Sequence, residues 1–283
     1  MPAAEITLPV TLAVLGAGFL HALWNAMLKQ AAGDPLLDTA LIVAGGSIVA
    51  LALLPLVGAP DRAAWPFMVV SAVIHFGYYV TLAGAYRRGD LSFAYPLMRG
   101  VAPLIVTVLG IVFLGERPTA VTLVGIALIS LGILVIAWYA GGRHTAVAAG
   151  WALANAVIIA LYTLVDGAGT RASGNAGGYV CWLMFLEGLP YLAWIYATRG
   201  RVAHDYLTRR WRRGIAGGAA SLAAYGIALW AMTRAPVAVV AALREVSVLF
   251  AAGIGAWVLK EGFGWKRMIG AATVVAGVAA LRL

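Results

Sequence analysis

The sequence contains a single cysteine and few charged side chains. One cysteine, Cys181, excludes an internal disulfide and any metal cluster built on several thiolates. Because it lies inside an apolar run, we interpret it as a small core residue. Asp, Glu, Lys and Arg together make up 11% of the 283 residues, whereas soluble domains carry about a quarter. So little charge cannot cover a water-exposed surface, and the soluble classes of protein are therefore excluded.

The charge that is present is mostly positive, with a formal net charge of +9. The basic residues lie in short links between apolar runs rather than on an amphipathic surface, and six arginines crowd the link 199–213. This distribution is typical of the positive-inside rule and of contact with anionic lipid headgroups. We therefore expect membrane lipid, and no nucleic acid, as a partner.

Hydrophobic residues make up 63% of the chain and form stretches of about twenty residues, each long enough to cross the hydrocarbon core of a membrane. The short links between them contain Gly, Pro, Asp and Asn, which favour turns. The sequence predicts an all-α membrane protein of ten transmembrane helices, over 8–30, 36–58, 64–86, 91–114, 119–139, 146–166, 177–198, 213–233, 236–259 and 265–282.

The chain repeats itself at a distance of 145 residues, so that 99–135 superimposes on 244–280. The most informative matches involve residue types that are scarce here or that allow close helix contact: Arg99/Arg244, Glu116/Glu261, Gly125/Gly270 and Gly132/Gly277. Each half holds five spans, an odd number, so the second half must enter the membrane from the opposite side. We predict two inverted five-helix repeats, 1–140 and 146–283, an arrangement typical of secondary transporters.

Three segments carry a resemblance to a known family. LGERPTAVTLVGIALISLGILV (114–135) and LKEGFGWKRMIGAATVVAGVAAL (259–281) resemble the end of an EamA-type unit, and GFLHALWNAMLK (18–29) resembles its opening helix. The chain is thus similar to the ten-helix branch of the drug/metabolite transporter superfamily. The resemblance implies export or exchange of small metabolites, including amino acids. The aromatic third and fourth spans are most similar to bacterial aromatic-amino-acid exporters.

Polar side chains inside the spans are costly in hydrocarbon, so each requires a reason. We predict a central cavity walled by spans one, three, four, six, eight and nine, with Pro96 interrupting the helix of span four. Its substrate-binding residues share helical faces or flank that interruption. They are Trp24, His75, Tyr78, Tyr95, Arg99, Tyr225 and Arg244.

Two of these, Arg99 and Arg244, allow two interpretations of equal weight. Arginine stays protonated, so inside a membrane it needs a carboxylate partner, a wet cavity or an anionic ligand. The first interpretation is a structural ion pair, for Arg244 with Glu187 or Glu245. The second is contact with the carboxylate of a substrate.

The acidic residues suggest several roles. For Glu116 and Glu261, which close their spans, we favour helix capping or an ion pair with Arg117 and Lys260. Small multidrug members of the superfamily carry a glutamate in span one for proton exchange, but span one here contains no acidic residue. His75, Asp166 and Glu187 remain candidate proton carriers, and a passive facilitator or exchanger fits equally well.

We therefore expect a secondary transporter of the bacterial inner membrane that moves small amphipathic metabolites, with amino acids as the leading class. We expect it to work as a monomer without cofactor, metal or catalytic residues. The alternative is an intramembrane, transferase-like enzyme acting on a lipid or small metabolite. The sequence contains no HExxH, GxGD, GxSxG or P-loop motif, which favours the transporter.

The positive-inside rule predicts the orientation. Apart from the two arginines within spans, thirteen Lys and Arg residues fall on the side of link 199–213 and five on the other. We predict that this link is cytoplasmic and that both termini are outside, although family members are often described with both termini inside. A C-terminal reporter that works only in the cytoplasm should be inactive. Strong activity from that fusion would contradict the orientation.

Overall fold

The structure, a computed structural model, describes residues 6–29, 34–89, 91–139, 145–258 and 264–282. Within these ranges every regular element is helical, which confirms the predicted class. The elements are α1 (Leu8–Lys29), α2 (Pro35–Val57), the 3-10 helix η1 (Arg62–Ala64), α3 (Trp65–Arg88), α4 (Leu91–Leu114), α5 (Ala120–Trp138), α6 (Ala146–Ala172), α7 (Ala176–Arg209), α8 (Trp211–Met232), α9 (Val237–Arg244), α10 (Ser247–Val258) and α11 (Trp265–Ala280).

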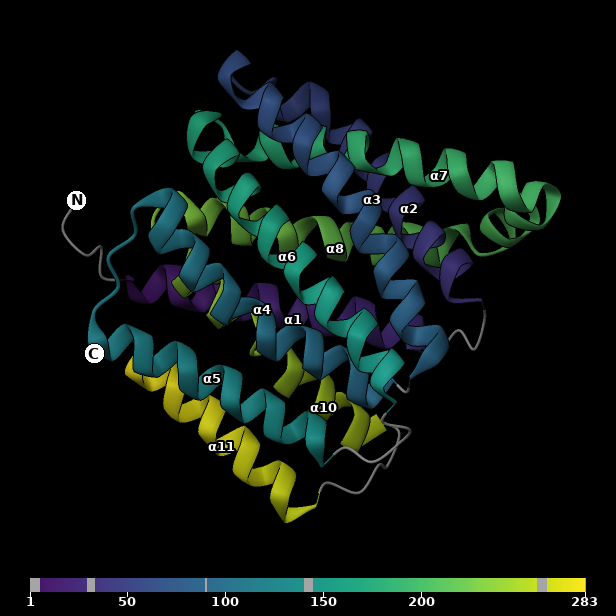
Figure 1. Ribbon diagram of the computed structural model, residues 1–283. Coiled ribbons are helices and arrows are strands. Elements are labelled where there is room, and N and C mark those ends of the chain that lie inside the picture. The colour runs from purple at the N-terminus through teal and green to yellow at the C-terminus, as the bar shows by residue number, and fades with distance from the viewer. Residues whose placement is uncertain (1–5, 30–33, 90, 140–144, 259–263, 283) are drawn as a thin grey trace.

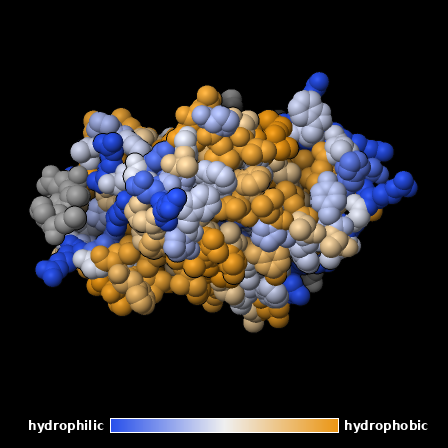
Figure 2. All heavy atoms as spheres, turned by 90° about the horizontal axis from the view of Figure 1, so that it is seen from above, coloured by the Kyte–Doolittle hydropathy of each residue, from blue (hydrophilic) through white to orange (hydrophobic). Residues whose placement is uncertain are grey.

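The surface and the helix lengths identify a multi-pass membrane protein. In the described ranges, eight helices, α1 to α8, are long and apolar enough to cross a membrane alone. The shorter α9 and α10 follow one another through the predicted ninth span, and α11 lies in the tenth. Figure 2 shows hydrophobic residues gathered across the middle of the molecule and hydrophilic residues gathered at its two ends. We call the end that holds the α7–α8 junction the arginine-rich end, and the other the opposite end.

The pattern of helix contacts stays the same when the two halves are exchanged. The 145-residue shift equates α1 with α6, α2 with α7, α3 with α8, α4 with α9–α10, and α5 with α11. Accordingly, α3 packs on α6 as α8 packs on α1, and α4 packs on α6 as α9 and α10 pack on α1. Two further pairs, α2 with α7 and α5 with α11, join equivalent helices across the pseudo-symmetry axis. Five helices per half reverse the direction of each equivalent, so the repeats are inverted as predicted.

The α5–α11 pair shows how closely the halves meet (Figure 1). A Cβ atom added to Gly132 would lie 2.5 Å from the carbonyl oxygen of Gly270, and one added to Gly125 would lie 3.0 Å from that of Gly277. The repeat maps Gly125 onto Gly270 and Gly132 onto Gly277, so the two contacts are symmetry copies of each other. Glycine is required here because the backbones themselves touch, and the predicted contact stripe is confirmed.

The prediction that Pro96 interrupts span four is wrong. Helix α4 runs from Leu91 to Leu114 through both Pro96 and Pro103, since a membrane helix tolerates the loss of single backbone hydrogen bonds. The discontinuity lies instead in span nine, where α9 ends at Arg244 and α10 begins at Ser247. There the amides of Glu245 and Val246 donate to carbonyls only three residues back.

Much of the arginine-rich link is helical, beyond the predicted end of span seven at residue 198. Helix α7 continues to Arg209, with a bend at Gly200, where φ is 49° and ψ is −123°. A positive φ favours glycine, which has no Cβ atom to clash. Beyond the bend, Tyr206 donates a hydrogen bond to Asp38 of α2, and the Arg210 guanidinium lies 4.0 Å from the centre of the Tyr206 ring. The link therefore packs on the bundle.

Replacing Gly132 with alanine should destabilise the protein. The added methyl would meet the Gly270 carbonyl, and overpacking of this kind costs about 1–3 kcal/mol. Gly150→Ala is the matched control, because nothing lies within 4 Å of a Cβ atom at that position of α6. Thermal unfolding in detergent measures the difference, and equal unfolding temperatures for the two variants would disprove the close contact.

Candidate substrate-binding cavity

A cavity lies between the two halves, toward the arginine-rich end. Its volume is about 80 Å³, enough for several water molecules. Seven helices contribute its walls, and most of the wall side chains are aromatic or polar: His21, Trp24, Thr39, Ile42, Val43, His75, Tyr78, Tyr79, Leu82, Tyr162, Met184, Glu187, Ser221, Tyr225 and Arg244. Such a lining suits a ligand with an apolar body and a charged end.

Five of the seven predicted site residues line this cavity, namely Trp24, His75, Tyr78, Tyr225 and Arg244. The other two, Tyr95 and Arg99, come from α4 and are not among its wall residues. The walls include α2 and α7, which the prediction omitted, and lack α4.

Sequence reasoning left other wall residues out of the site, among them His21, Tyr79, Tyr162 and Glu187. Helical spacing could have found two of them. His21 precedes Trp24 by three positions and Tyr79 follows His75 by four, so each shares a helix face with a predicted site residue.

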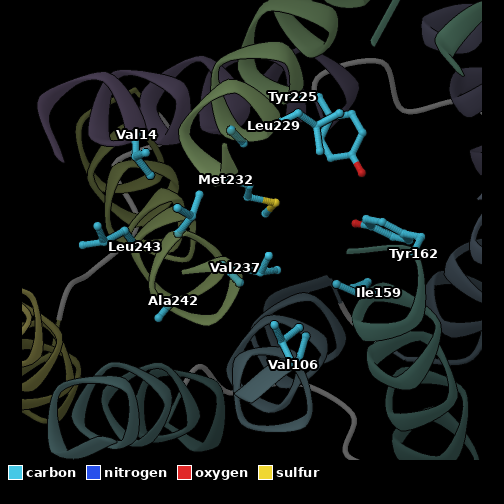
Figure 3. Packing of buried hydrophobic residues seen from close by; sticks show 14 of the residues in the cluster. Val14, Val106, Ile159, Tyr162, Tyr225, Leu229, Met232, Val237, Ala242 and Leu243 are labelled. Atoms are coloured by element: carbon cyan, nitrogen blue, oxygen red, sulfur yellow. The ribbon is translucent and has the colours of Figure 1, made fainter. Parts of the chain in front are cut away.

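Aromatic rings form the walls nearest the centre. The ring of His75 stacks on that of Tyr162 with centroids 4.2 Å apart, and the ring of Tyr225 stands edge-on to both. Figure 3 shows the hydroxyl groups of Tyr162 and Tyr225 pointing into the same open space. These rings offer apolar faces to a ligand and hydroxyl groups to its polar end.

Arg244 is the cation of the cavity wall. It is only 8% exposed, and its guanidinium lies 5.1 Å from the centre of the Tyr225 ring. Neither ion pair expected for it forms: Glu245 pairs with Arg99, and Glu187 accepts a hydrogen bond from Tyr79. Within the described part of the chain, Arg244 has no carboxylate within 4.0 Å and no hydrogen bond. The two acids expected to pair with Arg244 thus contact other residues.

Arg99, its repeat equivalent, has a different environment. Its Nε lies 3.0 Å from Oε2 of Glu245, and both residues are buried. Its Nη2 lies 2.6 Å from Nε2 of His21. Because a guanidinium only donates, Nε2 of His21 accepts, and its Nδ1 carries the proton. The indole N–H of Trp24, 3.3 Å from Nδ1, therefore makes an edge contact there and not a hydrogen bond. Arg99 thus joins α1, α4 and the break between α9 and α10.

Two further carboxylates lie near His75. Asp166 of α6 accepts hydrogen bonds from the hydroxyl groups of Tyr179, at 3.0 Å, and Tyr225. Glu187 of α7 accepts one from Tyr79, at 2.9 Å, and its second oxygen lies 3.3 Å from Nδ1 of His75. Buried acids therefore flank the aromatic wall on one side of the cavity.

At the opposite end of the molecule, charged side chains bind the backbone where α8 ends and α9 begins. The Glu116 carboxylate accepts from the amides of Val237, at 2.6 Å, and Ala238, at 3.3 Å, where α9 begins. It also lies 3.5 Å from Arg171, which donates to the carbonyl of Met232 at the end of α8. We call this group the Glu116–Arg171 clamp.

The clamp confirms the predicted capping role of Glu116, while the ion pair forms with Arg171 rather than Arg117. Glu261 and Lys260 lie outside the described residues. Val106, Ile159 and Val237 belong to one cluster of buried hydrophobic residues (Figure 3).

Two inverted five-helix repeats around a central cavity define a class of membrane protein to which many secondary transporters belong. The model of the EamA-like transporter family matches residues 8–138 and 146–283, and the chain belongs to that family. No curated protein matches the sequence. A solved structure titled "Crystal structure of protein" is similar over 97% of this chain and 98% of its own, with a TM-score of 0.76 and 20% identity. At this identity the similarity shows the fold alone.

The ion pair between Arg99 and Glu245 should be essential to stability. Glu245→Gln leaves a buried guanidinium unpaired, and losing one partner of a buried pair costs about 3–5 kcal/mol. The double variant Arg99→Met with Glu245→Gln removes both charges and should recover most of that loss. Thermal unfolding of both singles and the double in detergent gives the coupling. Strictly additive effects would show that the two side chains do not interact.

Proposed function

We propose that the protein is a secondary transporter that exports or exchanges small amphipathic carboxylates, amino acids first among them, across the bacterial inner membrane. The observation that carries the proposal is Arg244, a buried cation in an aromatic cavity with no acidic partner in the described residues. Membership of a transporter family supports the transport class. One chain encloses the whole cavity, so we propose that the monomer is functional.

The cavity offers complementary groups to both parts of such a ligand. A guanidinium binds a carboxylate through two parallel hydrogen bonds, which fixes the orientation of the ligand as well as holding it. The Tyr225 ring lies against the Arg244 guanidinium and supports it. The rings of Tyr78 and Tyr162 then provide an apolar surface for the rest of the ligand.

Alternating access follows from the inverted repeats. In this conformation the cavity lies toward the arginine-rich end, and the Glu116–Arg171 clamp joins helix termini at the opposite end. Exchanging the conformations of the two halves would reverse this arrangement. With the arginine-rich end in the cytoplasm, as the charge distribution predicts, the present conformation is the one that loads from the cytoplasm.

Replacing Arg244 with alanine should weaken transport by tenfold or more. Hydrogen bonds to charged groups contribute about 1.5–3 kcal/mol, which corresponds to about ten- to hundredfold in affinity. The measurement is counterflow of radiolabelled amino acids, and of amines that lack the carboxylate, in proteoliposomes. Arg234→Ala is the control, because Arg234 is exposed beside Trp230 and is not among the cavity walls.

Each outcome of this assay has a separate meaning. If Arg244→Ala and Arg234→Ala behave alike, Arg244 does not bind the substrate carboxylate. If the wild-type protein moves none of the solutes, the proposed class of substrate is wrong. Recovery of chemically altered solute would favour the intramembrane enzyme instead.

A further inference from the structure

We propose that Glu187 is a proton-binding site and that its proton is exchanged for the ammonium group of the substrate, so that transport is coupled to protons moving in the opposite direction. This inference rests on the proposed transport function. It concerns a second ionisable group of the cavity wall, on α7, whereas Arg244 is on α9.

The geometry leaves one oxygen of Glu187 available. The residue is 3% exposed and lies in the cavity wall, with Oε1 accepting from Tyr79. In the described residues Oε2 has no hydrogen-bond partner. Nδ1 of His75 lies 3.3 Å from it, and that nitrogen also lies 3.0 Å from the backbone carbonyl and 3.1 Å from the hydroxyl oxygen of Ser71. Since a carbonyl only accepts, Nδ1 carries its hydrogen toward Ser71 and does not take a proton from Glu187.

The other buried acids nearby are already satisfied. Asp166 accepts from two phenol groups, one on each oxygen, which stabilises the ionised form. Glu245 is paired with Arg99. In the described residues Oε2 of Glu187 and Oε2 of Glu245 both lack a hydrogen bond, but Glu245 lies against the permanently charged Arg99. Glu187 is therefore the acid of the three that can gain and lose a proton without breaking a hydrogen bond or an arginine ion pair.

The groups around Glu187 set the charge that it experiences. Helix α7 packs on α2, α3, α6 and α8. From α2 only uncharged side chains reach the cavity wall. The titratable and charged groups that face the acid from the other elements are His75 and Tyr79 of α3, Tyr162 and Asp166 of α6, Tyr225 of α8 and, across the cavity, Arg244 of α9.

The lack of a cationic partner explains why Glu187 binds a proton when the cavity is empty. In the described residues the only potential cation beside its Oε2 is His75, whose Nδ1 hydrogen is directed at Ser71, so ionised Glu187 would be a buried charge without a partner, which is costly. A proton on Oε2 removes that charge. When a zwitterion binds, its carboxylate neutralises Arg244 and its ammonium takes the place of the proton beside Glu187, and the released proton passes to water at the cavity mouth. One site cannot hold both cations, so they move in opposite directions.

Infrared spectroscopy tests the proton site without any transport. In reconstituted wild-type protein, the band of a protonated carboxyl group should appear as the pH is lowered and disappear as it is raised. The band should be absent from Glu187→Gln. Asp205→Asn, which removes an exposed carboxylate on the far part of α7, is the control and should keep the band. Absence of a titrating band that depends on Glu187 would overturn the proposal, whatever the transport assays give.

Transport in proteoliposomes tests the coupling. With an acidic lumen, the wild-type protein and Asp205→Asn should accumulate a transported amino acid by up to about tenfold per pH unit at one proton per substrate. Glu187→Gln should bring the amino acid only to equal concentrations on both sides. A pH-sensitive dye in the lumen should report proton exit for the wild-type protein and not for Glu187→Gln. Glu187→Asp, which keeps a carboxylate, should restore part of the accumulation.

The results separate the two proposals. Wild-type counterflow without accumulation or proton movement would refute the coupling and leave the transport function standing. Added to detergent-solubilised protein in weak buffer, the amino acid should release protons and the same acid without its amino group should not. Equal release by both would show that the ammonium does not displace the proton.

Discussion

The buried ion pair between Arg99 and Glu245 determines the electrostatics of the whole interior. It joins α4 of the first half to the break between α9 and α10 in the second half, and it occupies the one carboxylate adjacent to Arg244 in sequence. A buried arginine without a partner is costly. Because Glu245 is bound to Arg99, the charge of Arg244 must be stabilised by the cavity, its water and its ligands.

Close backbone contacts provide the rigid frame around that pair. At the α5–α11 contact, Gly125 and Gly132 meet Gly277 and Gly270 through their carbonyl oxygens. A second contact brings Gly46 of α2 against Gly218 of α8, close enough that a Cβ on Gly218 would lie 2.1 Å from the Gly46 amide nitrogen. Packing between small residues is directional and short-ranged. The α5–α11 contact joins two helices that contribute no residue to the cavity wall, so it can hold the two halves in register while the cavity helices change position.

The sequence was sufficient for the fold because its signals were repeated. Long apolar stretches predict ten spans, and the 145-residue register independently relates spans four and five to spans nine and ten. Within the cavity, helical spacing placed His75, Tyr78 and Tyr225 among the walls, but it could not show which carboxylate an arginine meets, because that depends on contacts between helices distant in sequence. Similarly, Pro96 is a local signal for a broken helix that tertiary packing overrides, and nothing local marks the discontinuity after Arg244.

The two repeats are equivalent in fold but not in charge, and this difference assigns their roles. Arg99 is followed by Gly100, whereas Arg244 is followed by Glu245. Glu245 is the only acid that directly follows one of the two arginines in the sequence. It belongs to the second half, yet its side chain meets Arg99 of the first half. An acid at position 100 as well as at position 245 could have neutralised both arginines and left the cavity without a buried cation. Because the single acid at this position of the repeat meets Arg99, it is Arg244 that we propose binds the anionic ligand.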